Sequence, residues 1–454
     1  MAVATSDPVR LPPASRAPKA AQGVAFLTAR LRTLTALRRH YGGAFTLNMP
    51  VLGRTVVVSD PQLVRDLFST SRDLLGRPKV NLKDIMGPGS MFTLDGDELF
   101  ERRRLLAPPF HGKRVVDDEY IVEEEVMRET ANWPEGREFA TLPSMMRITL
   151  NAILRAVFGA EGPALDELRR LLPPTVALGS RIALLPQVAR RDFGAWSPGR
   201  RLIGLRREID DVIASLIAEA RNDPRFDERS DVLAVLMQAR YEDGEPMSDS
   251  HIADELVTML SAGHETTSAG LSWAVERIRR HPRLLERLSE EVDAGGRELR
   301  QATIWEVLRT RPVLDGALRR TRQRIRLGEW VIPEDYTIWA SIQLAHASEE
   351  SFPDAASFDP DRFIGATPKP ITWIPFGGGI NRCIGAAFAT MEMDVTLRTL
   401  LREFRIMPTN APSERDRNRG VSHVPARGAR AVVYRRRTDA PKAATSSVAD
   451  RMRF

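Results

Sequence analysis

Apolar residues recur every three to four positions along most of the chain, the spacing that places them on one face of an α-helix. The pattern predicts helices over residues 23–40 and 102–108, and another that begins at Asp60-Pro61. It also predicts a long helical region over residues 117–281, with breaks at residues 133–136, 159–162 and 223–229. Short β-branched or alternating runs predict strands at residues 45–47, 56–59, 330–332, 337–340 and 431–434. We therefore expect a mainly α fold with a minor antiparallel β-sheet.

Internal domain boundaries are not visible, because the chain carries neither an internal repeat nor a clean linker. Residues 76–97 are rich in Gly, Pro and Asp and predict a long irregular loop, a kind of loop that is usually functional in compact proteins. Residues 1–22 predict a flexible N-terminal segment, and the polar residues 438–454 predict a disordered tail. We expect one domain over residues 23–437.

The longest predicted helix runs from an N-cap at Ser248 or Asp249 to about Arg280, just before Pro282. At about 1.5 Å per residue it is roughly 50 Å long, enough to cross a whole domain. Its middle, residues 262–267, brings small residues, a carboxylate and two hydroxyls into an apolar helix. Two interpretations stay open on this motif alone. One is a widened helix whose acid and alcohol handle protons, and the other is a tolerated glycine kink with exposed polar residues.

A zinc site is a competing interpretation of the same helix. His264 and Glu265 resemble the start of the zinc-protease motif H-E-x-x-H, but the fifth position is Ser268. Two imidazoles four residues apart are needed to place both ligands on one helix face. With a single histidine, the sequence argues against a zinc hydrolase.

Composition narrows the chemistry, because the 454 residues include a single cysteine, Cys383. One thiol excludes an internal disulfide, a multi-thiolate zinc site and an iron–sulfur cluster. The net charge is +6 and 60 of the 66 basic residues are arginine, but 60 acidic residues are mixed among them. This balance predicts a solvated surface and no nucleic-acid partner. The absence of a signal peptide or a membrane span predicts a soluble, cytoplasmic protein.

The segment from Phe376 to Gly385 carries the clearest chemistry and reads Phe-Gly-Gly-Gly-Ile-Asn-Arg-Cys-Ile-Gly. Its glycines permit backbone conformations that side chains forbid, and they let amide N–H groups point at the sulfur. Cys383 directly precedes a predicted helix over residues 386–404, whose positive end favours a thiolate. Such a thiolate suits one open coordination position of an iron, whereas a buried structural cysteine would not explain the glycine run.

This segment resembles the haem-thiolate loop of the cytochrome P450 monooxygenases. Residues 262–266 resemble the oxygen-activating motif of the family's long central helix, and Glu306-Val307-Leu308-Arg309 resembles its E-x-x-R helix. Residues 358–363 resemble the meander segment, which supplies the second arginine of a Glu–Arg–Arg network. The four motifs stand in the family's order, and the likeness extends over about residues 41–434.

The resemblance implies a cytochrome P450 fold, with haem b (iron protoporphyrin IX) between the long central helix and the cysteine-loop helix. Cys383 is then the axial iron ligand, and Glu265 and Thr266 deliver protons, with Thr266 also holding dioxygen. A buried structural ion network is expected from Glu306, Arg309 and Arg362. Contact with the haem is expected from Arg103, Ala262, Gly263, Arg319, Phe376, Gly379, Arg382, Cys383 and Gly385.

Two positions depart from the family pattern. Asn381 stands two residues before the cysteine, where a basic residue often binds a haem propionate, and Leu99 stands where the family usually has His or Trp. Arg103 and Arg319 remain as propionate donors, and Arg382 becomes one if the loop turns it inward. We expect haem to bind with a propionate anchor that is either weaker or rewired.

The resemblance further implies hydroxylation or epoxidation of a small lipophilic substrate by dioxygen. Electrons then come from a separate ferredoxin or flavodoxin with its NAD(P)H reductase, because the chain has no Gly-rich nucleotide loop after a strand. Two alternatives are a haem-thiolate enzyme that uses peroxide or does not oxygenate, and a helical binding protein without chemistry. The substrate pocket is expected from residues 76–94, 175–201, 257–266 and 313–317, with Arg181 and Asp315 as polar handles.

Overall fold

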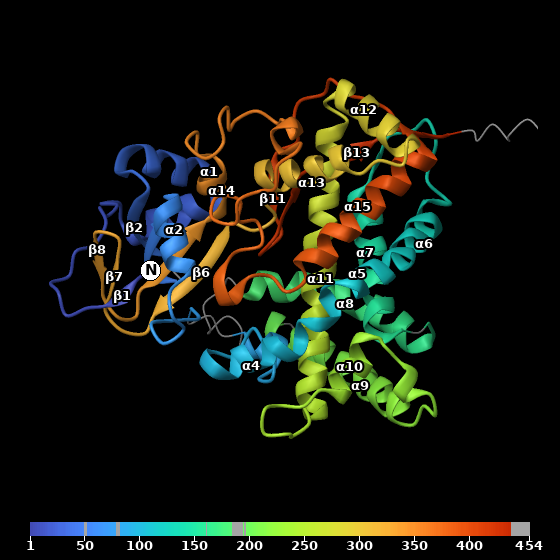
Figure 1. Ribbon diagram of the computed structural model, residues 1–454, viewed down its shortest axis with the longest axis horizontal. Coiled ribbons are helices and arrows are strands. Elements are labelled where there is room, and N and C mark those ends of the chain that lie inside the picture. Colours follow the sequence, from blue (N-terminus) through green and yellow to red (C-terminus); the bar gives the residue numbers. More distant parts are fainter. Residues whose placement is uncertain (50–51, 79–81, 160, 184–193, 195–196, 437–454) are drawn as a thin grey trace, which may run out of the picture.

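The long helix α11 (Asp249–Ile278) crosses the middle of the molecule (Figure 1). On one side lie α6 (Glu119–Thr130), α7 (Leu142–Phe158) and α15 (Ala386–Glu403). On the other lie the strands β2 (Ala44–Met49), β6 (Gly316–Thr321), β7 (Ile325–Leu327) and β8 (Trp330–Ile332), together with α1 (Lys19–Tyr41). The computed structural model describes residues 1–436 apart from 50–51, 79–81, 160, 184–193 and 195–196. The tail predicted over residues 438–454 lies outside the described residues.

Helices make up most of the described chain, which confirms the mainly α prediction. The longer ones are α1 (Lys19–Tyr41), α2 (Pro61–Phe68), α4 (Gly96–Leu106), α6 (Glu119–Thr130), α7 (Leu142–Phe158), α8 (Pro163–Ala183), α9 (Pro198–Arg221), α10 (Val232–Gln238), α12 (Pro282–Asp293), α13 (Glu298–Thr310) and α15 (Ala386–Glu403). Short helices are α3 (Lys83–Met86), α5 (Lys113–Asp117) and α14 (Ile342–His346). The breaks predicted inside residues 117–281 each separate two of these helices.

The central helix begins where its capping residue predicts. The Ser248 hydroxyl accepts a hydrogen bond from the backbone N–H of His251, which makes Ser248 the N-cap. Most of the α11 side chains are buried, and α11 packs along α7 over most of the length of that helix. A helix that is buried all round is a core element, so α11 fixes the positions of the polar side chains in its middle, residues 262–267.

The main sheet pairs strands from distant parts of the chain. Within the described residues its order is β2 (Ala44–Met49), β3 (Gly53–Val58), β9 (Thr337–Ser341), β6 (Gly316–Thr321) and β4 (Leu75–Gly76). Its pairs are antiparallel except β3 with β9, which is parallel from Thr55 opposite Thr337. The prediction of an antiparallel sheet is corrected at this pair. Parallel strands need a long crossover, and this one spans most of the chain.

The remaining strands form a three-stranded sheet, in the order β1 (Val3–Ala4), β7 (Ile325–Leu327) and β8 (Trp330–Ile332), and three separate pairs within the described residues. The pairs use β5 (Phe139–Ala140), β13 (Arg430–Ala431), β10 (Phe404–Ile406), β14 (Val433–Arg435), β11 (Asp416–Asn418) and β12 (His423–Pro425). Residues 1–22, for which the sequence predicts a flexible segment, include β1, which pairs with β7. Ala2 is only 3% exposed, and its backbone N–H donates to the hydroxyl of Thr70 at 3.0 Å.

Candidate active site

The loop before α15 presents the single thiol at the start of that helix. Cys383 donates its backbone N–H to the carbonyl of Phe376 at 2.9 Å, which closes the loop. Gly379 has φ +62°, and a Cβ there would collide with the backbone carbonyl of Phe68 at the end of α2. A Cβ on Gly378 would strike the Phe68 ring. These glycines are therefore required by the close approach of the loop to α2.

The Cys383 thiol lies in a mixed electrostatic environment. Its own surface is exposed, but enough protein surrounds it that burial raises the pKa of the thiol. The backbone N–H of Gly385 and the positive charges of Arg103 and Arg382 act in the opposite direction. Coordination of a metal ion removes a thiol proton by itself, so this donor set suits a metal-bound thiolate.

Three arginines gather beside the cysteine loop, of which Arg319 is buried and Arg77 and Arg103 are half-buried. Arg319 on β6 is 6% exposed and donates to the carbonyls of Leu318 (2.9 Å) and Gly378 (2.7 Å). Arg103 on α4 donates to the carbonyl of Arg382 at 2.5 Å. Arg77 follows β4, and its buried Nε has no hydrogen-bond partner. In the described part of the chain, none of Arg77, Arg103 and Arg319 forms an ion pair with a carboxylate.

Positive charge is concentrated in this cluster. Burial lowers the pKa of Arg319 to about 10, and the charges of Arg77 and Arg103 push it in the same direction. Burial also lowers the pKa of Arg77 to about 10, although the nearby Asp95 opposes this change. One buried and two half-buried guanidinium groups that repel one another would be stabilised by an anionic partner. A haem carries two propionates, so the arginine cluster fits this cofactor.

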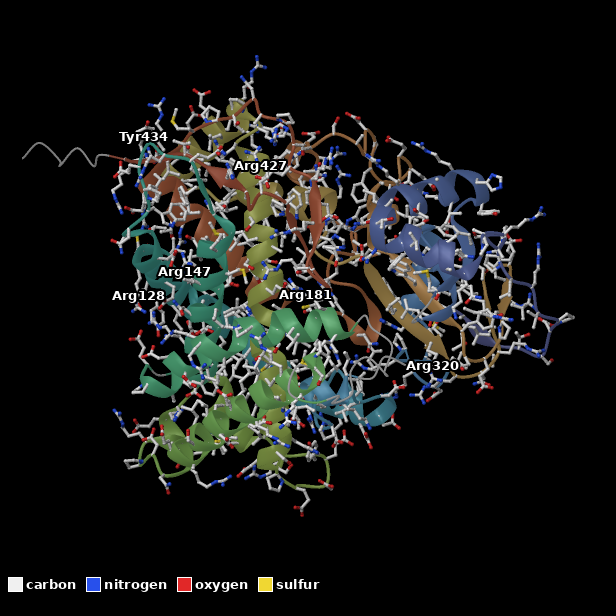
Figure 2. The ribbon with its side chains drawn as sticks, turned by 180° about the vertical axis from the view of Figure 1, so that it is seen from behind. Arg128, Arg147, Arg181, Arg320, Arg427 and Tyr434 are labelled. Atoms are coloured by element: carbon white, nitrogen blue, oxygen red, sulfur yellow. The ribbon has the colours of Figure 1, made fainter. Side chains whose placement is uncertain are left out.

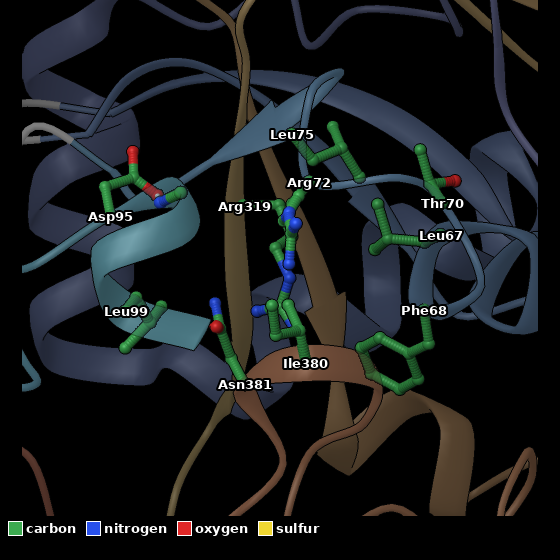
Figure 3. Close-up of a pocket in the computed structure, with 11 residues that line it drawn as sticks. Leu67, Phe68, Thr70, Arg72, Leu75, Asp95, Leu99, Arg319, Ile380 and Asn381 are labelled. Atoms are coloured by element: carbon green, nitrogen blue, oxygen red, sulfur yellow. Dashed lines mark hydrogen bonds between the residues drawn. The ribbon is translucent and has the colours of Figure 1, made fainter. Parts of the chain in front are cut away.

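The two departures from the family pattern meet at the same place. Leu99, Asn381 and Arg319 line one small pocket (Figure 3). Leu99 is only 2% exposed, and the buried Oδ1 of Asn381 has no hydrogen-bond partner. Arg77 was missed by the sequence reasoning, because it sits in an irregular loop where only the pairing of β4 with β6 brings it near Arg319. The side chain of Arg382 is exposed and that of Arg77 is half-buried, so Arg77 rather than Arg382 is the additional guanidinium at this pocket.

The polar middle of α11 bonds partly to its own backbone. The hydroxyl of Thr266 donates to the carbonyl of Ala262 at 2.8 Å, and that of Thr267 donates to Gly263 at 3.1 Å. A Cβ on Gly263 would lie 3.1 Å from Ile153 of α7, so this glycine serves the close packing of the two helices. From the sequence, Gly263 was predicted only to contact the haem, and its packing role was not predicted.

The Glu265 carboxylate contacts a different part of the fold from the Thr266 hydroxyl, which bonds within α11. Its Oε1 accepts a hydrogen bond from Ser422 Oγ at 2.9 Å and lies 3.3 Å from Nε of Arg419. Both partners belong to the turn between β11 and β12. No hydrogen bond joins Glu265 to Thr266 among the described contacts of these two residues. Sequence reasoning missed Arg419 and Ser422, which lie more than 150 residues after Glu265.

The neighbouring histidine does not form a metal site. His264 is fully buried, and its Nδ1 lies 2.8 Å from the carbonyl of Leu260. Within the described residues, no three His, Cys, Asp or Glu side chains are grouped so that they could hold a metal ion. The structure therefore gives the zinc interpretation no support.

The residues predicted to form an ion network lie together. Glu306 is fully buried and accepts hydrogen bonds from Nε and Nη2 of Arg309, both at 2.7 Å. The Nε of Arg362 lies 3.4 Å from the same carboxylate, and the backbone N–H of Asp359 donates to it at 2.9 Å. The network ties α13 to the segment that precedes the cysteine loop.

The segments expected to line a substrate pocket are only partly described, because residues 79–81, 184–193 and 195–196 lie outside the described residues. The 76–94 loop is fastened to α11, where Gly89 N–H donates to Asp254 at 2.8 Å. Asp315 forms an ion pair with Arg30 and lies 2.9 Å from Nε2 of His423, so the positive charge of Arg30 already compensates this carboxylate. Arg181 lies near the end of α8 and is exposed (Figure 2).

Comparison with known proteins gives the class and the family. The family model for cytochrome P450 matches residues 22–429. The chain belongs to the cytochrome P450 family, and it is therefore a haem-thiolate monooxygenase, which uses dioxygen and an electron donor. A Mycobacterium tuberculosis protein named cytochrome P450 138 is 56% identical over 429 residues, which cover 94% of this chain and 97% of the relative.

More distant relatives agree in length and fold. Cytochrome P450 135B1 of the same species is 38% identical, with 92% of this chain and 90% of the relative covered. Retinoic acid-bound CYP120A1 from a cyanobacterium has a TM-score of 0.80 at 21% identity, covering 94% of this chain and all of the other. The haem domain of cytochrome P450DA has a TM-score of 0.81 at 20% identity, covering 94% and 98%. These structures confirm the cytochrome P450 fold. None of the described helices is long and apolar enough to cross a membrane.

Proposed function

We propose that this enzyme hydroxylates or epoxidises a small lipophilic substrate. One atom of dioxygen enters the substrate and the other leaves as water, with two electrons from a redox partner and two protons from solvent. The observation that carries the proposal is the lone Cys383 thiol, set at the start of α15 by glycines that cannot be replaced without collision. Residues 23–437 are proposed as the haem domain.

The cofactor is proposed to be haem b, which supplies the iron at which dioxygen is activated. Cys383 would ligate that iron, and Arg77, Arg103 and Arg319 would hold the propionates as charge-assisted donors. Phe376, Gly379 and Gly385 shape the loop around the ligand. Ala262 and Gly263 of α11, whose side chains are small, would leave room for the cofactor beside the central helix.

The proton-transfer residues are proposed to be Glu265 and Thr266. A carboxylate can take up a proton from solvent and hand it on, and a hydroxyl can orient the acceptor through its single O–H. The Thr266 hydroxyl donates to Ala262 in the structure, so it has to rotate away from that carbonyl before it serves another acceptor. Members of the family that use peroxide or do not oxygenate tend to lack this pair, which favours oxygenation by dioxygen here.

The electron donor is proposed to be a separate acidic ferredoxin or flavodoxin with its NAD(P)H reductase. Arg382 is exposed next to Cys383 and forms no ion pair with a described residue, so it offers a free positive charge. Arg402 on α15, by contrast, is paired with Glu123 at 2.8 Å and Glu403 at 2.9 Å. Arg382→Gln should slow electron transfer and weaken its salt dependence, whereas Arg402→Gln is the control with a neutralised charge.

The proposal is tested by absorption spectroscopy. The reduced protein with carbon monoxide should show the strongly red-shifted band of thiolate-ligated haem, and Cys383→Ala should abolish it. A purified protein that stays colourless after haem reconstitution would contradict every catalytic assignment. Titration of the oxidised protein with fatty acids, terpenoids and steroids, read as shifts of the haem absorption, then identifies the substrate class. A protein whose binding is confined to charged, water-soluble compounds would contradict the lipophilic assignment.

A further inference from the structure

The turn between β11 and β12 reaches the central helix at the proposed acid. Ser422 donates to Glu265 Oε1 at 2.9 Å, and Arg419 Nε lies 3.3 Å from the same oxygen. The Glu265 side chain is 6% exposed, whereas that of Arg419 is 26% exposed. A carboxylate this deeply buried is therefore compensated by one cation and one hydroxyl that come from a single hairpin.

This hairpin is itself fixed in place on several sides. The indole N–H of Trp273 on α11 donates to the carbonyl of His423 at 3.0 Å. The His423 ring lies between the carboxylates of Asp315 (2.9 Å) and Asp416 (2.6 Å). At its tip, a Cβ on Gly420 would lie 2.7 Å from Ser180 of α8, and Gly420 has φ +115°. The hairpin therefore sits wedged between α8 and α11.

The orientation of the Glu265 carboxylate follows from the hairpin rather than from Thr266. Adjacent residues of an α-helix point about 100° apart, so the two side chains of the acid–alcohol pair do not define one another's position. The Thr266 hydroxyl is engaged with Ala262, and Glu265 is engaged with Ser422 and Arg419. Among the described residues, the Glu265 carboxylate is held by two side chains of this hairpin, Ser422 and Arg419.

We propose that Arg419, assisted by Ser422, is the positioning residue of the proton-delivering carboxylate Glu265. Arg419 keeps the carboxylate in one orientation and, through its partly exposed guanidinium, joins it to bulk water, from which the proton is taken. The inference rests on the proposed role of Glu265. It adds a residue outside the family motifs, and it makes proton delivery depend on how the hairpin sits against α8.

The test uses the haem-loaded enzyme with a plant-type ferredoxin, its NADPH-dependent reductase and NADPH, without added substrate. The readout is the fraction of NADPH electrons recovered as hydrogen peroxide, because reduction of dioxygen beyond peroxide requires further protons. We expect Arg419→Gln to raise this fraction at least about two-fold and Arg419→Lys to restore most of the difference. Arg417→Gln is the matched control, since Arg417 is exposed on the same hairpin, and it should leave the fraction unchanged.

A double-variant cycle separates positioning from general damage to the structure. In a Glu265→Gln background the carboxylate is absent, so Arg419→Gln should have no further effect on the peroxide fraction. An equal effect of Arg419→Gln in both backgrounds would overturn the proposal. Gly420→Ala, which pushes the hairpin tip away from α8, should raise the peroxide fraction in the native background, and no rise would also count against the proposal.

Failure of this inference is distinguishable from failure of the proposed function. If Glu265→Gln and Thr266→Ala raise the peroxide fraction but Arg419→Gln does not, the positioning role is wrong and the proton-transfer pair stands. If none of the three changes the fraction, the assignment of the pair itself is wrong. The carbon monoxide spectrum of each variant verifies that the thiolate-ligated haem is intact.

Discussion

The ion network around Glu306 offers the sharpest test of the energetics, because all five N–H groups of one buried arginine are engaged. Arg309 gives two of them to Glu306 at 2.7 Å and the others to the carbonyls of His346 (2.9 Å), Ala355 (2.9 Å) and Ser357 (2.8 Å). Glu306→Gln preserves the size of the side chain but removes the charge. It leaves a guanidinium that is almost wholly buried without its counter-ion.

The expected loss follows from that uncompensated charge. Breaking one partner of a buried pair costs about 3–5 kcal/mol of unfolding free energy. Arg309→Met should cost more, because it strands the Glu306 carboxylate and also leaves three carbonyls without donors, at about 1–3 kcal/mol each. A surface pair of similar geometry, Arg287 with Asp361 at 2.7 and 2.9 Å, is about half exposed on both sides. There Asp361→Asn should cost only about 0–1 kcal/mol.

The assay is urea unfolding of the haem-loaded protein, followed in parallel by far-ultraviolet circular dichroism and by the thiolate–haem absorption. The unfolding free energy should be highest for the wild type and Asp361→Asn, which should be nearly equal. It should be lower for Glu306→Gln and lowest for Arg309→Met. Equal midpoints for Glu306→Gln and Asp361→Asn would refute the reasoning, because burial would then not be what makes the pair costly to break. Coincident curves from the two probes are needed to treat the unfolding as two-state.

Three further changes test the cofactor loop and its surroundings. Arg77→Gln should speed haem transfer to apomyoglobin about ten-fold, and Leu99→His in the same chain should slow it again; an unchanged rate would exclude Arg77 from the propionate anchor. Burial lowers the pKa of His346 to about 3, below its unfolded value of 6.5, so the folded state binds fewer protons than the unfolded state between these pH values. The unfolding free energy should therefore fall as the pH falls from about 6.5 to 3, by up to about 1.4 kcal/mol per pH unit. His346→Gln should flatten that slope in unfolding midpoints measured against pH, and an identical slope would contradict this origin. Gly379→Ala should lower the haem-to-protein ratio of the purified enzyme, whereas Gly295→Ala, with φ +73° and nothing within 4 Å of its Cβ, should not.

Local signals explain which features could be predicted from the sequence. The central helix was predicted from about residue 249 to residue 280 and spans Asp249–Ile278, because a capping serine and a proline mark its two ends within a few residues. The helix after Cys383 was predicted over residues 386–404 and spans Ala386–Glu403, because its helical periodicity begins directly after Gly385. The thiol, the glycines and the acid–alcohol motif are also short stretches that need no knowledge of distant contacts.

Features that depend on contacts between residues far apart in the chain could not be predicted from the sequence. The parallel pairing of β3 with β9 joins residues about 280 positions apart, and no pattern within either strand reveals it. Arg77 looks like any polar residue of an irregular loop until β4 pairs with β6. Arg419 resembles a surface arginine of a C-terminal hairpin, and only the packing of that hairpin against α11 brings it to Glu265.

The arginine excess is best understood through what guanidinium groups do inside this protein. Arg279 on the last turn of α11 donates to the carbonyls of Met407 and Arg430, and Arg309 serves three carbonyls as well as a carboxylate. A lysine has three donors on a single nitrogen and cannot bridge such separated acceptors. Exposed arginines, such as Arg147 beside Glu129 at 2.6 Å, are often paired (Figure 2).

The basic net charge therefore says little about a nucleic-acid or partner surface until the arginines beside the cysteine loop, which have no carboxylate partner, are left out of the count. Among the described residues, Arg77, Arg103 and Arg319 contribute three positive charges without a carboxylate partner, and they stand beside the cysteine loop. The two propionates of haem b would offset two of these three charges. The remaining charge lies close to the Cys383 sulfur, where Arg103 already favours the thiolate. If the arginines serve the cofactor in this way, the apo-protein should be the less stable form, and the gain in unfolding free energy on haem binding should shrink in Arg77→Gln while the fold of the apo-protein is retained.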